Sequence, residues 1–284
     1  MKTVVITGAS TGIGAAAARH MAAQGWRVFA GVRRKADGEA LKQSASGNLI
    51  PIILDVTDPA QLAAAVEKVS DALAGECLAG LVNNAGIAKF GPLAIVPMEE
   101  FRTQFEVNVF GLLAATQAFV PLLGGDPKRS GPPGRIVNIT SVGGRISSPF
   151  LGPYTATKHA VEAMTDSLRR ELIIYGIDAI AVGPGSVRTP IWDKAEEANE
   201  TGPYADSDWA GPVKTFERVM VEGGRTGLPP EEIAKVIGYA LTEEKPKARY
   251  APVPDKFTNW TIASRLPKRM LDRVFWKRLG LKKR

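Results

Sequence analysis

The chain opens on KTVVITGASTGIG, residues 2–14, where a short apolar run leads directly into closely spaced glycines. Val4, Val5 and Ile6 are typical of a buried strand, and the alanines that follow Gly14 are typical of a helix. Glycines between a strand and a helix permit a tight turn and let backbone N–H groups approach a phosphate at the positive end of the helix. The segment therefore predicts a strand, a turn and a helix that together bind a nucleotide.

The alternation continues along the chain, and predicts the following elements. Strands are expected over residues 2–7, 27–32, 49–54, 78–83, 135–140, 178–182 and 249–253, and helices over 12–24, 58–74, 99–122, 155–175 and 231–242. Near-continuous apolar strands alternating with helices indicate a parallel sheet covered on both faces. We expect an α/β fold with one doubly wound, Rossmann-type domain of about seven strands.

We place this domain at residues 1–254. Residues 190–228 break the alternation with aromatic residues among glycines, prolines and acids, which suits a lid of short helices over the substrate. Residues 255–284 form a basic, amphipathic C-terminal extension. No linker or internal repeat marks a second domain.

Composition excludes several classes of protein. The 284 residues are 45% hydrophobic and 23% charged, as in ordinary globular proteins. The single cysteine, Cys77, excludes an internal disulfide and a cysteine-based zinc site, and fits a reducing compartment. Two isolated histidines give no ligand cluster, so no metal is expected. Without a long apolar run or a signal peptide, the expected location is the cytoplasm.

The glycine turn has two interpretations. Its spacing is G-x-x-x-G-x-G, so it departs from the general G-x-G-x-x-G pattern of dinucleotide sites. The same residues contain G-x-S-x-G around Ser10, the pattern of a hydrolase nucleophile. With only nine residues before Ser10 there is no preceding strand and loop for an oxyanion hole, so we prefer the nucleotide site. Its predicted members are Gly8, Ser10, Thr11, Gly12, Ile13 and Gly14.

The end of the second strand bears on which dinucleotide is bound. An acidic residue there would accept the 2′-hydroxyl of NAD, but this chain has Arg33, Arg34 and Lys35, with the first acid at Asp37. Arginine binds phosphate with two parallel hydrogen bonds. We therefore predict NADP (NADPH), with NAD as the alternative. A basic surface loop that binds no ligand would have the same sequence.

A tyrosine and a lysine stand four residues apart at the start of the predicted helix 155–175. Tyr154 and Lys158 are neighbours on a helix surface at this spacing. A nearby ammonium is expected to lower the pKa of the phenol, which suits proton exchange with an alcohol or ketone. An exposed helical pair has the same pattern. Ser141 follows a predicted strand and so lies at its carboxyl end, where ligands bind in such sheets.

These motifs together resemble the classical short-chain dehydrogenase/reductase family over residues 1–254. Thr7–Gly14 is similar to its T-G-x-x-x-G-x-G loop, and residues 83–86 to its N-N-A-G motif. The resemblance implies that Tyr154 is the general acid/base and that Ser141 binds the reacting oxygen. It also implies that Lys158 holds the nicotinamide ribose, and that Asn108 supports a water chain to Lys158.

The resemblance also implies further cofactor contacts, from Pro-Gly-x-Val-x-Thr at 184–189 and from the acid that follows the third strand. The added residues are Asp55, Val56, Asn83, Ala85, Gly86, Pro184, Gly185, Val187 and Thr189, besides Tyr154 and Lys158. The segment 150–172 looks like the branch that acts on retinoids and steroids. A hydrophobic substrate pocket is expected from Phe150, Trp192 and Phe216, although each could instead pack the lid onto the body.

The positive charge of the chain is concentrated near its C-terminus. The net charge is +7, but residues 265–284 hold nine Lys/Arg and one Asp, a net +8, which leaves −1 for the other 264 residues. In a helix over this tail, the cations lie on one face and five apolar residues share the other. These apolar residues are Met270, Leu271, Val274, Phe275 and Leu279. Such a helix either packs on the body or a second subunit, or lies on an anionic membrane surface. Nucleic acid is not expected, because no aromatic-and-basic groove accompanies the charge.

Taken together, the sequence predicts an NADP(H)-dependent oxidoreductase that interconverts an alcohol and its ketone or aldehyde. The substrate is expected to be steroid-, retinoid- or lipid-like. A homodimer or homotetramer is implied by the family resemblance. The alternative is a regulator or scaffold that binds NAD(P) on the same fold without catalysis, although such proteins tend to lose the tyrosine or the lysine, and both are present here.

Overall fold

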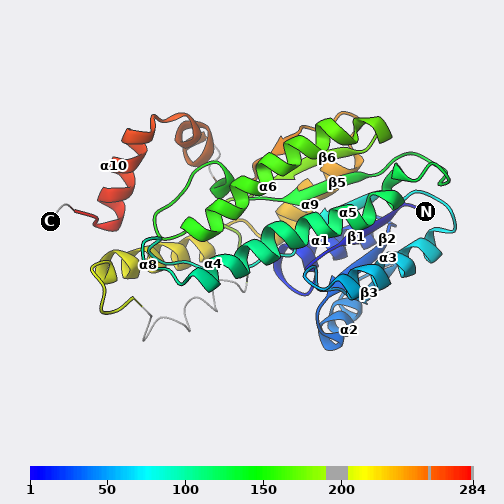
Figure 1. Ribbon diagram of the computed structural model, residues 1–284, viewed down its shortest axis with the longest axis horizontal. Helices are drawn as coiled ribbons and strands as arrows, with labels where there is room; N and C mark the ends of the chain where they lie inside the picture. The colour runs from blue at the N-terminus through cyan, green and yellow to red at the C-terminus, as the bar shows by residue number, and fades with distance from the viewer. Residues whose placement is uncertain (190–203, 255–256, 283–284) are drawn as a thin grey trace.

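The computed structural model describes residues 1–189, 204–254 and 257–282. Seven parallel strands form one sheet in the order β3-β2-β1-β4-β5-β6-β7 (Figure 1). The strands are β1 (Thr3–Ile6), β2 (Arg27–Val32), β3 (Leu49–Ile53), β4 (Gly80–Asn83), β5 (Arg135–Ile139), β6 (Asp178–Val182) and β7 (Arg249–Tyr250). The order reverses direction at β1, as in doubly wound sheets. The predicted fold class is confirmed.

Helices cover both faces of this sheet. They are α1 (Gly12–Ala23), α2 (Lys35–Gln43), α3 (Pro59–Leu73), α4 (Met98–Phe105), α5 (Leu112–Phe119), α6 (Gly152–Glu171), α8 (Ala210–Arg225), α9 (Pro230–Thr242) and α10 (Lys268–Leu279). Residues of α1 and α9 belong to one buried cluster, and residues of α3 and α5 to the other. The sheet therefore has a core on each side.

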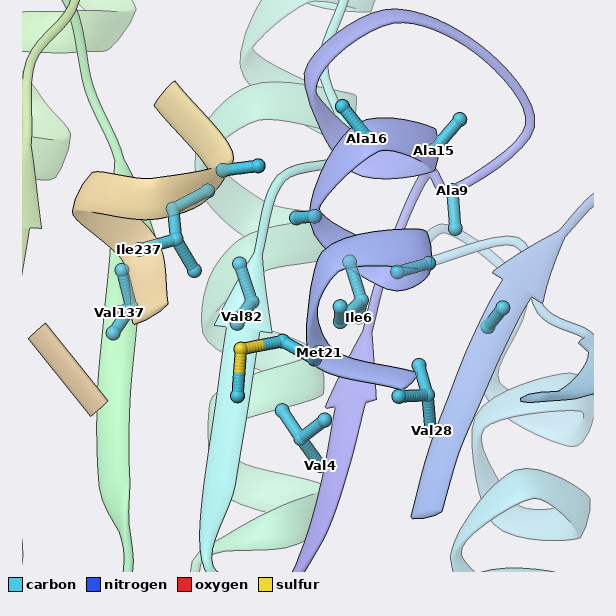
Figure 2. Close-up of a cluster of buried hydrophobic side chains, with 14 of the residues drawn as sticks. Val4, Ile6, Ala9, Ala15, Ala16, Met21, Val28, Val82, Val137 and Ile237 are labelled. Carbon is cyan, nitrogen blue, oxygen red and sulfur yellow. The ribbon is translucent and has the colours of Figure 1, made fainter. Parts of the chain in front are cut away.

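The strands divide their side chains between the two cores. Val4 and Ile6 of β1 point to the side of α1, whereas Val5 points to the side of α3, because successive strand residues face opposite ways. All three are fully buried. Figure 2 shows the first cluster, in which alanines of α1 let this helix lie close to β1 and β4. The alanine-rich sequence after Gly14 thus serves close packing of a helix on the sheet.

Two helical regions differ from the prediction. Helix α2 was not predicted, because its segment is polar and only Gly38 and Leu41 are buried. The predicted helix 99–122 is divided: η1 (Glu106–Gly111), a π-helical turn, separates α4 from α5, and η2 (Pro121–Gly125) follows. A π-turn inserts an extra residue into the helix and is frequent at functional sites. Asn108 lies inside η1.

The C-terminal part of the chain also differs in detail. Strand β7 ends at Tyr250 rather than at Val253, since the prolines at 252 and 254 lack the N–H group that a ladder needs. The predicted lid contains α8, a helix of 16 residues. Helix α10 lies above α8 in the view of Figure 1, at the opposite end of the molecule from the N-terminus. Among the described residues no helix has the length and apolar character needed to cross a membrane.

Candidate active site

The predicted site residues gather at one edge of the sheet. Thr7 follows β1, Asn84 follows β4, Ser141 lies just past the end of β5, and Pro184 lies just past β6. The carboxyl ends of parallel strands meet at the same edge, which is where doubly wound sheets bind ligands. The N–H of Val142 donates to the carbonyl of Pro184 at 2.9 Å, so the loops after β5 and β6 are joined directly.

The glycine turn requires glycine for steric reasons. Gly8 has φ of +63°, and a Cβ on it would lie 2.7 Å from Cα of Ala85. Gly12 has φ of +56°, and a Cβ there would lie 3.1 Å from the methyl group of Thr189. The left-handed conformation and the close neighbours both exclude larger residues. The turn is thus pressed between two loops that were predicted to contact the cofactor.

Two polar side chains fix the glycine turn against the loop after β4. The Thr7 hydroxyl oxygen accepts the N–H groups of Asn84 and Ala85, each at 3.0 Å. The Asn84 amide donates to the carbonyls of Thr7 at 3.1 Å and Gly8 at 2.8 Å. Sequence reasoning placed neither side chain in the site, although Asn84 stands within the N-N-A-G motif. Both hold the turn in place.

The start of α1 fits the pyrophosphate of a dinucleotide. Thr11 is the N-cap residue, and its side chain makes no capping hydrogen bond to the helix. The first N–H groups of a helix have no partner within the helix, and here the positive end of the helix dipole adds to their attraction for an anion. Residues Gly12, Ile13 and Gly14 form this first turn. The uncapped helix end therefore matches the predicted phosphate site.

The two arginines after β2 differ in their surroundings. Both nitrogens of Arg34 that face Asp37 are bonded to its carboxylate, at 2.9 Å each. Arg33 is exposed, and the described residues include no ion-pair partner for it. Because Asp37 neutralises Arg34, Arg33 is the cation of this pair that is left to meet an anionic ligand.

The other predicted cofactor residues occupy different environments. Asp55 is half-buried, and its Oδ1 accepts from the N–H and hydroxyl of Thr57, at 3.0 and 2.8 Å. Val56 is buried beside Gly111 of η1. The Asn83 side chain points into the core, where it donates to Thr116 and Asn138 at 2.9 Å each. Only the backbone of Asn83 is therefore placed to face a nucleotide.

The structure brings the tyrosine, serine and lysine together. Ser141 is the N-cap of η3 (Val142–Gly144), and its hydroxyl accepts the N–H of Gly143 at 3.0 Å. The Tyr154 hydroxyl is hydrogen-bonded to Ser141. Lys158 lies one turn later on α6, with its Nζ 5.6 Å from the centre of the Tyr154 ring. The same Nζ donates to the carbonyl of Ile139 at 2.8 Å.

Burial shifts the pKa of both titratable groups away from the charged form. Burial raises the pKa of Tyr154, while the hydrogen bond to Ser141 acts in the opposite direction. Burial lowers the pKa of Lys158 to about 8, and the negative charge of Glu162 opposes this shift. The expectation that the Lys158 ammonium lowers the pKa of Tyr154 is thus wrong for this structure, since burial of the phenol has the larger effect. Tyr154 is protonated at neutral pH.

Asn108 joins the loop after β4 to α6. Its Oδ1 accepts the N–H of Ile87 at 2.8 Å, and its Nδ2 donates to the carbonyl of Ile87 at 2.9 Å and to the hydroxyl of Thr157 at 3.1 Å. Asn108 is buried. A Cβ on Gly86 would lie 3.2 Å from Oδ1 of Asn108 and 3.8 Å from Nζ of Lys158. Asn108, Gly86 and Lys158 therefore lie at one place.

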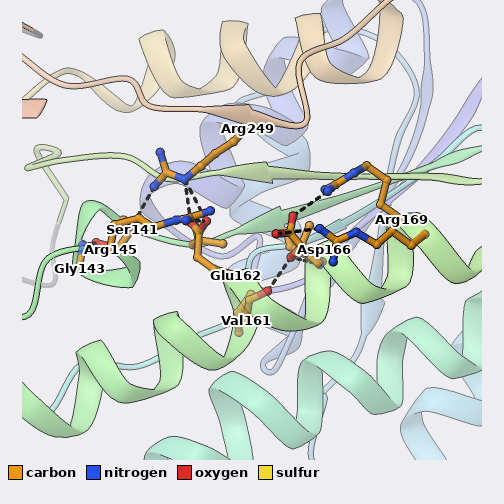
Figure 3. Close-up of polar contacts among 12 residues, drawn as sticks. Ser141, Gly143, Arg145, Val161, Glu162, Asp166, Arg169 and Arg249 are labelled. Atoms are coloured by element: carbon orange, nitrogen blue, oxygen red, sulfur yellow. Dashed lines mark hydrogen bonds and ion pairs between the residues drawn. The ribbon is translucent and has the colours of Figure 1, made fainter. Parts of the chain in front are cut away.

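Sequence reasoning missed a buried carboxylate behind these groups. Glu162 accepts from the hydroxyl of Thr140 at 2.6 Å, from Arg145 at 3.1 Å, and from Nε of Arg249 at 3.0 and 2.9 Å (Figure 3). Arg249 also donates to the carbonyl of Ser141 at 3.2 Å. A charged residue four positions after Lys158, on the buried face of the helix, was the available signal. Glu162 thus ties β5, η3 and β7 together around Ser141.

The predicted substrate residues are partly accounted for. Phe150 and Phe216 are buried against each other, with ring centres 5.8 Å apart, in a cluster that also includes Leu279 of α10. Phe216 therefore packs α8 onto the body, whereas Phe150 also borders a pocket. Trp192 lies outside the described residues. The pocket, of about 250 Å³, is lined by Leu93, Ser147, Ser148, Pro149, Phe150, Gly152, Asp272, Phe275 and Trp276.

Comparisons with known proteins bear on this site. Residues 2–200 match the family model for short chain dehydrogenases. The chain is 39% identical over 279 residues to an NADPH-dependent 3-dehydrocapnine reductase of Ornithobacterium rhinotracheale, with 98% of each chain covered. It is 33% identical to retinol dehydrogenase 5 of Mus musculus, covering 95% of this chain and 86% of the relative.

A solved structure gives the same result. A short chain dehydrogenase/reductase from Burkholderia phymatum, in complex with NAD, superposes with a TM-score of 0.78 at 26% identity, covering 96% of this chain and 95% of the other. The family model covers more than half of the chain, and the curated relatives match nearly all of it. The chain belongs to the short-chain dehydrogenase/reductase family and is an oxidoreductase that acts on CH–OH groups.

Proposed function

We propose that this enzyme uses NADPH to reduce a hydrophobic ketone or aldehyde, with Tyr154, Ser141, Lys158 and Asn108 as its catalytic group. The observation that carries the proposal is the half-buried Tyr154, which is hydrogen-bonded to Ser141 and lies close to Lys158. It lies at the sheet edge that also holds the uncapped start of α1. The name of the Ornithobacterium relative, an NADPH-dependent reductase, supports the same direction and cofactor.

The chemistry is divided among these residues. When bound, the nicotinamide would supply the hydride for the carbonyl carbon. Ser141 donates a hydrogen bond to the carbonyl oxygen and so favours the negative charge that develops there. Tyr154 then gives its proton to that oxygen. Because burial raises the pKa of Tyr154, the phenol is protonated at neutral pH, which is the form needed for reduction.

Lys158 supports the tyrosine after it has lost its proton. Its ammonium, on the same helix, would stabilise the phenolate and bind the ribose hydroxyls of the nucleotide. With a pKa of about 8, Lys158 is a cation at neutral pH and loses its proton above that value. Asn108 keeps Gly86 and α6 at a fixed separation beside Lys158 through its bonds to Ile87 and Thr157. After the reaction, Tyr154 would regain its proton from the buried side of the site, where Lys158 and Asn108 lie.

The residues that would hold the dinucleotide surround this group. The turn at Gly8–Gly14 would bind the pyrophosphate, Asp55 and Val56 the adenine side, and Asn83, Ala85 and Gly86 the ribose. Thr189 lies against Gly12, and residues 184–189 would border the nicotinamide. Arg33, exposed at the end of β2, would bind the 2′-phosphate of NADP(H).

The proposed substrate class rests on the pocket between the 147–152 segment and α10. Its walls include Leu93, Pro149, Phe150, Phe275 and Trp276, and it borders the segment that leads from Ser141 to Tyr154. Apolar walls favour an apolar substrate because its surface leaves water on binding. We therefore propose a long-chain, steroid-like or retinoid-like carbonyl compound as the substrate.

The mechanism is tested by Tyr154→Phe, which removes one hydroxyl. Because the general acid contributes a factor of at least about 100, kcat should fall by that factor or more. Binding of NADPH, measured by fluorescence titration, should change little. Tyr175→Phe is the matched control, since Tyr175 lies at the exposed end of the segment after α6. Retained activity in Tyr154→Phe would remove the tyrosine from the mechanism.

The cofactor preference is tested by Arg33→Ala. A charge-assisted hydrogen bond contributes about 1.5–3 kcal/mol, so the Kd of NADPH should rise about tenfold while that of NADH stays nearly constant. Arg34→Ala should have a smaller effect because Asp37 already binds Arg34. Equal weakening of both cofactors by Arg33→Ala would rule out the 2′-phosphate contact.

A further inference from the structure

Helix α10 is joined to the body by one of its faces. Leu279 is 3% exposed and belongs to the cluster with Phe150, Val213 and Phe216. Leu271 and Phe275, on the same side of the helix, are half-buried. Asp272, Phe275 and Trp276 reach the pocket beside the 147–152 segment. The inner face of α10 is therefore a wall of the proposed substrate pocket.

The outer face of α10 is exposed and amphipathic. Met270 is 50% exposed and Val274 is 52% exposed, so the predicted single apolar face is divided between the body and solvent. The apolar pair is flanked by exposed cations: Arg269, Arg273, Lys277 and Arg278. Trp276, at one side of this face, is 45% exposed. Large apolar side chains among lysines and arginines are the composition of helices that lie in a membrane interface.

We propose that this outer face binds the surface of an anionic lipid bilayer and so presents the pocket to substrates dissolved in the membrane. Residues 268–279 hold five Lys/Arg and one acid, Asp272, which is paired with Arg269 at 3.3 Å. This excess of positive charge complements anionic headgroups. Met270 and Val274 would enter the acyl boundary while the longer cationic chains reach the headgroups.

The charge and composition of the outer face disfavour two other ligands, a second copy of the chain and nucleic acid. A second copy of the chain, related by a two-fold axis through this face, would bring the cations of both helices together. Nucleic acid would pair with the cations but leave Met270 and Val274 without apolar contact. A bilayer satisfies both kinds of side chain. The inference concerning substrate delivery rests on the proposed function, whereas membrane binding itself does not.

The test is sedimentation of the full-length protein with vesicles. We expect binding to vesicles of equal parts phosphatidylcholine and phosphatidylglycerol, weakening with salt, and little binding to phosphatidylcholine alone. Each cation near an anionic surface contributes about fivefold in binding, so Arg273→Glu with Lys277→Glu should reduce binding at least about 25-fold. The matched control reverses two exposed cations elsewhere, Lys245→Glu and Lys247→Glu.

A second variant and an activity assay separate the explanations. Met270→Ser with Val274→Ser should weaken binding at both low and high salt. NADPH-dependent reduction of a water-soluble ketone should be the same in all three double variants and the wild type. If the wild type binds vesicles but does not reduce the ketone, only the proposed function would be contradicted. The proposal that the outer face of α10 binds a membrane would be overturned by equal vesicle binding of the outer-face variants and the control. A preference of the protein for duplex DNA over vesicles would overturn it as well.

Discussion

Among the residues that the structure describes, Glu162 is the acidic group that raises the pKa of Lys158. Burial alone drives that pKa downward, and the carboxylate one turn away on α6 opposes it, giving a value of about 8. The carboxylate is itself held by Arg145, Arg249 and Thr140. The charge on Lys158 at neutral pH therefore depends on a residue that does not contact the reacting atoms.

We predict that Glu162→Gln moves the pH profile of reduction. Lys158 is a cation below its pKa, so kcat/KM of the wild type should fall as the pH rises through about 8. Without the negative charge the pKa of Lys158 is lower, and the fall should begin at a pH about half to one unit lower. Glu171→Gln, at an exposed position on the same helix, should leave the profile unchanged. An unshifted profile in Glu162→Gln would show that Glu162 has only a structural role.

At this scale the sequence predicted residue identities better than their ionisation. Tyr154 and Lys158 were singled out by their spacing along a helix and Ser141 by its position after a strand, whereas Asn108 was implied only by the family resemblance. The direction of the Tyr154 pKa shift was not predicted, because it depends on how much water surrounds the phenol. Glu162 was missed for the same reason, since only the packing of α6 buries it.

Polar side chains connect four elements through the middle of the sheet. Thr116 of α5, Asn83 of β4, Asn138 of β5 and Thr165 of α6 form a chain in which each amide donates at 2.9 Å. All four residues are buried. The two strands that carry Asn84 and Ser141 at their ends are thereby fixed to each other and to the helices on one face. This chain keeps the two halves of the site in register.

We predict that Thr165→Val destabilises the fold without altering its shape. The substitution keeps the volume but leaves the buried amide of Asn138 without its acceptor, which costs about 1–3 kcal/mol. The free energy of unfolding, measured with urea, should fall by that amount. Thr103→Val is the control, because Thr103 is exposed on α4. Equal stability of the two variants would show that the polar chain contributes nothing.

The elements themselves followed the hydrophobic pattern closely where they are buried on both faces. The strands β1 to β6 were predicted because sheets covered by helices need continuous apolar runs, whereas β7 has only two residues, both half-buried. Helix α2 was not predicted, because it covers an edge of the sheet and buries only two residues. The π-turn at Asn108 was not predicted either, since it changes the hydrogen bonding of the helix without changing its hydrophobic period.

For the molecule as a whole, the concentration of positive charge in residues 265–284 marked this segment as one that needed a structural explanation. The tail was recognised as separate, but its apolar residues were assigned to one face. The structure buries Leu279 and leaves Met270 and Val274 in solvent. Helical periodicity places residues around an axis, yet it does not reveal which side of the axis meets the body. That choice depends on α8 and the loop at 147–152.

We predict that Leu279→Asp separates α10 from the body and weakens substrate binding. A carboxylate cannot remain among Phe150, Val213 and Phe216 without a partner. Losing about 1.4 kcal/mol of contact with the pocket wall would raise KM for a long-chain ketone about tenfold, with little change for a short one. Val274→Asp makes the same substitution on the exposed face, and should leave KM unaltered in a vesicle-free assay. Parallel changes for long and short ketones would contradict a role of α10 in the pocket.

The pocket wall and the chemistry come from different stretches of the polypeptide. Tyr154, Ser141 and Lys158 belong to the sheet and its helices, whereas Phe275 and Trp276 belong to a helix that follows the last strand. Exchange of the coding segment for α10 between related genes would therefore replace one wall of the proposed substrate pocket while the proposed catalytic residues stayed in place. The proposed pocket could thus acquire another substrate preference without any change in the proposed catalytic group.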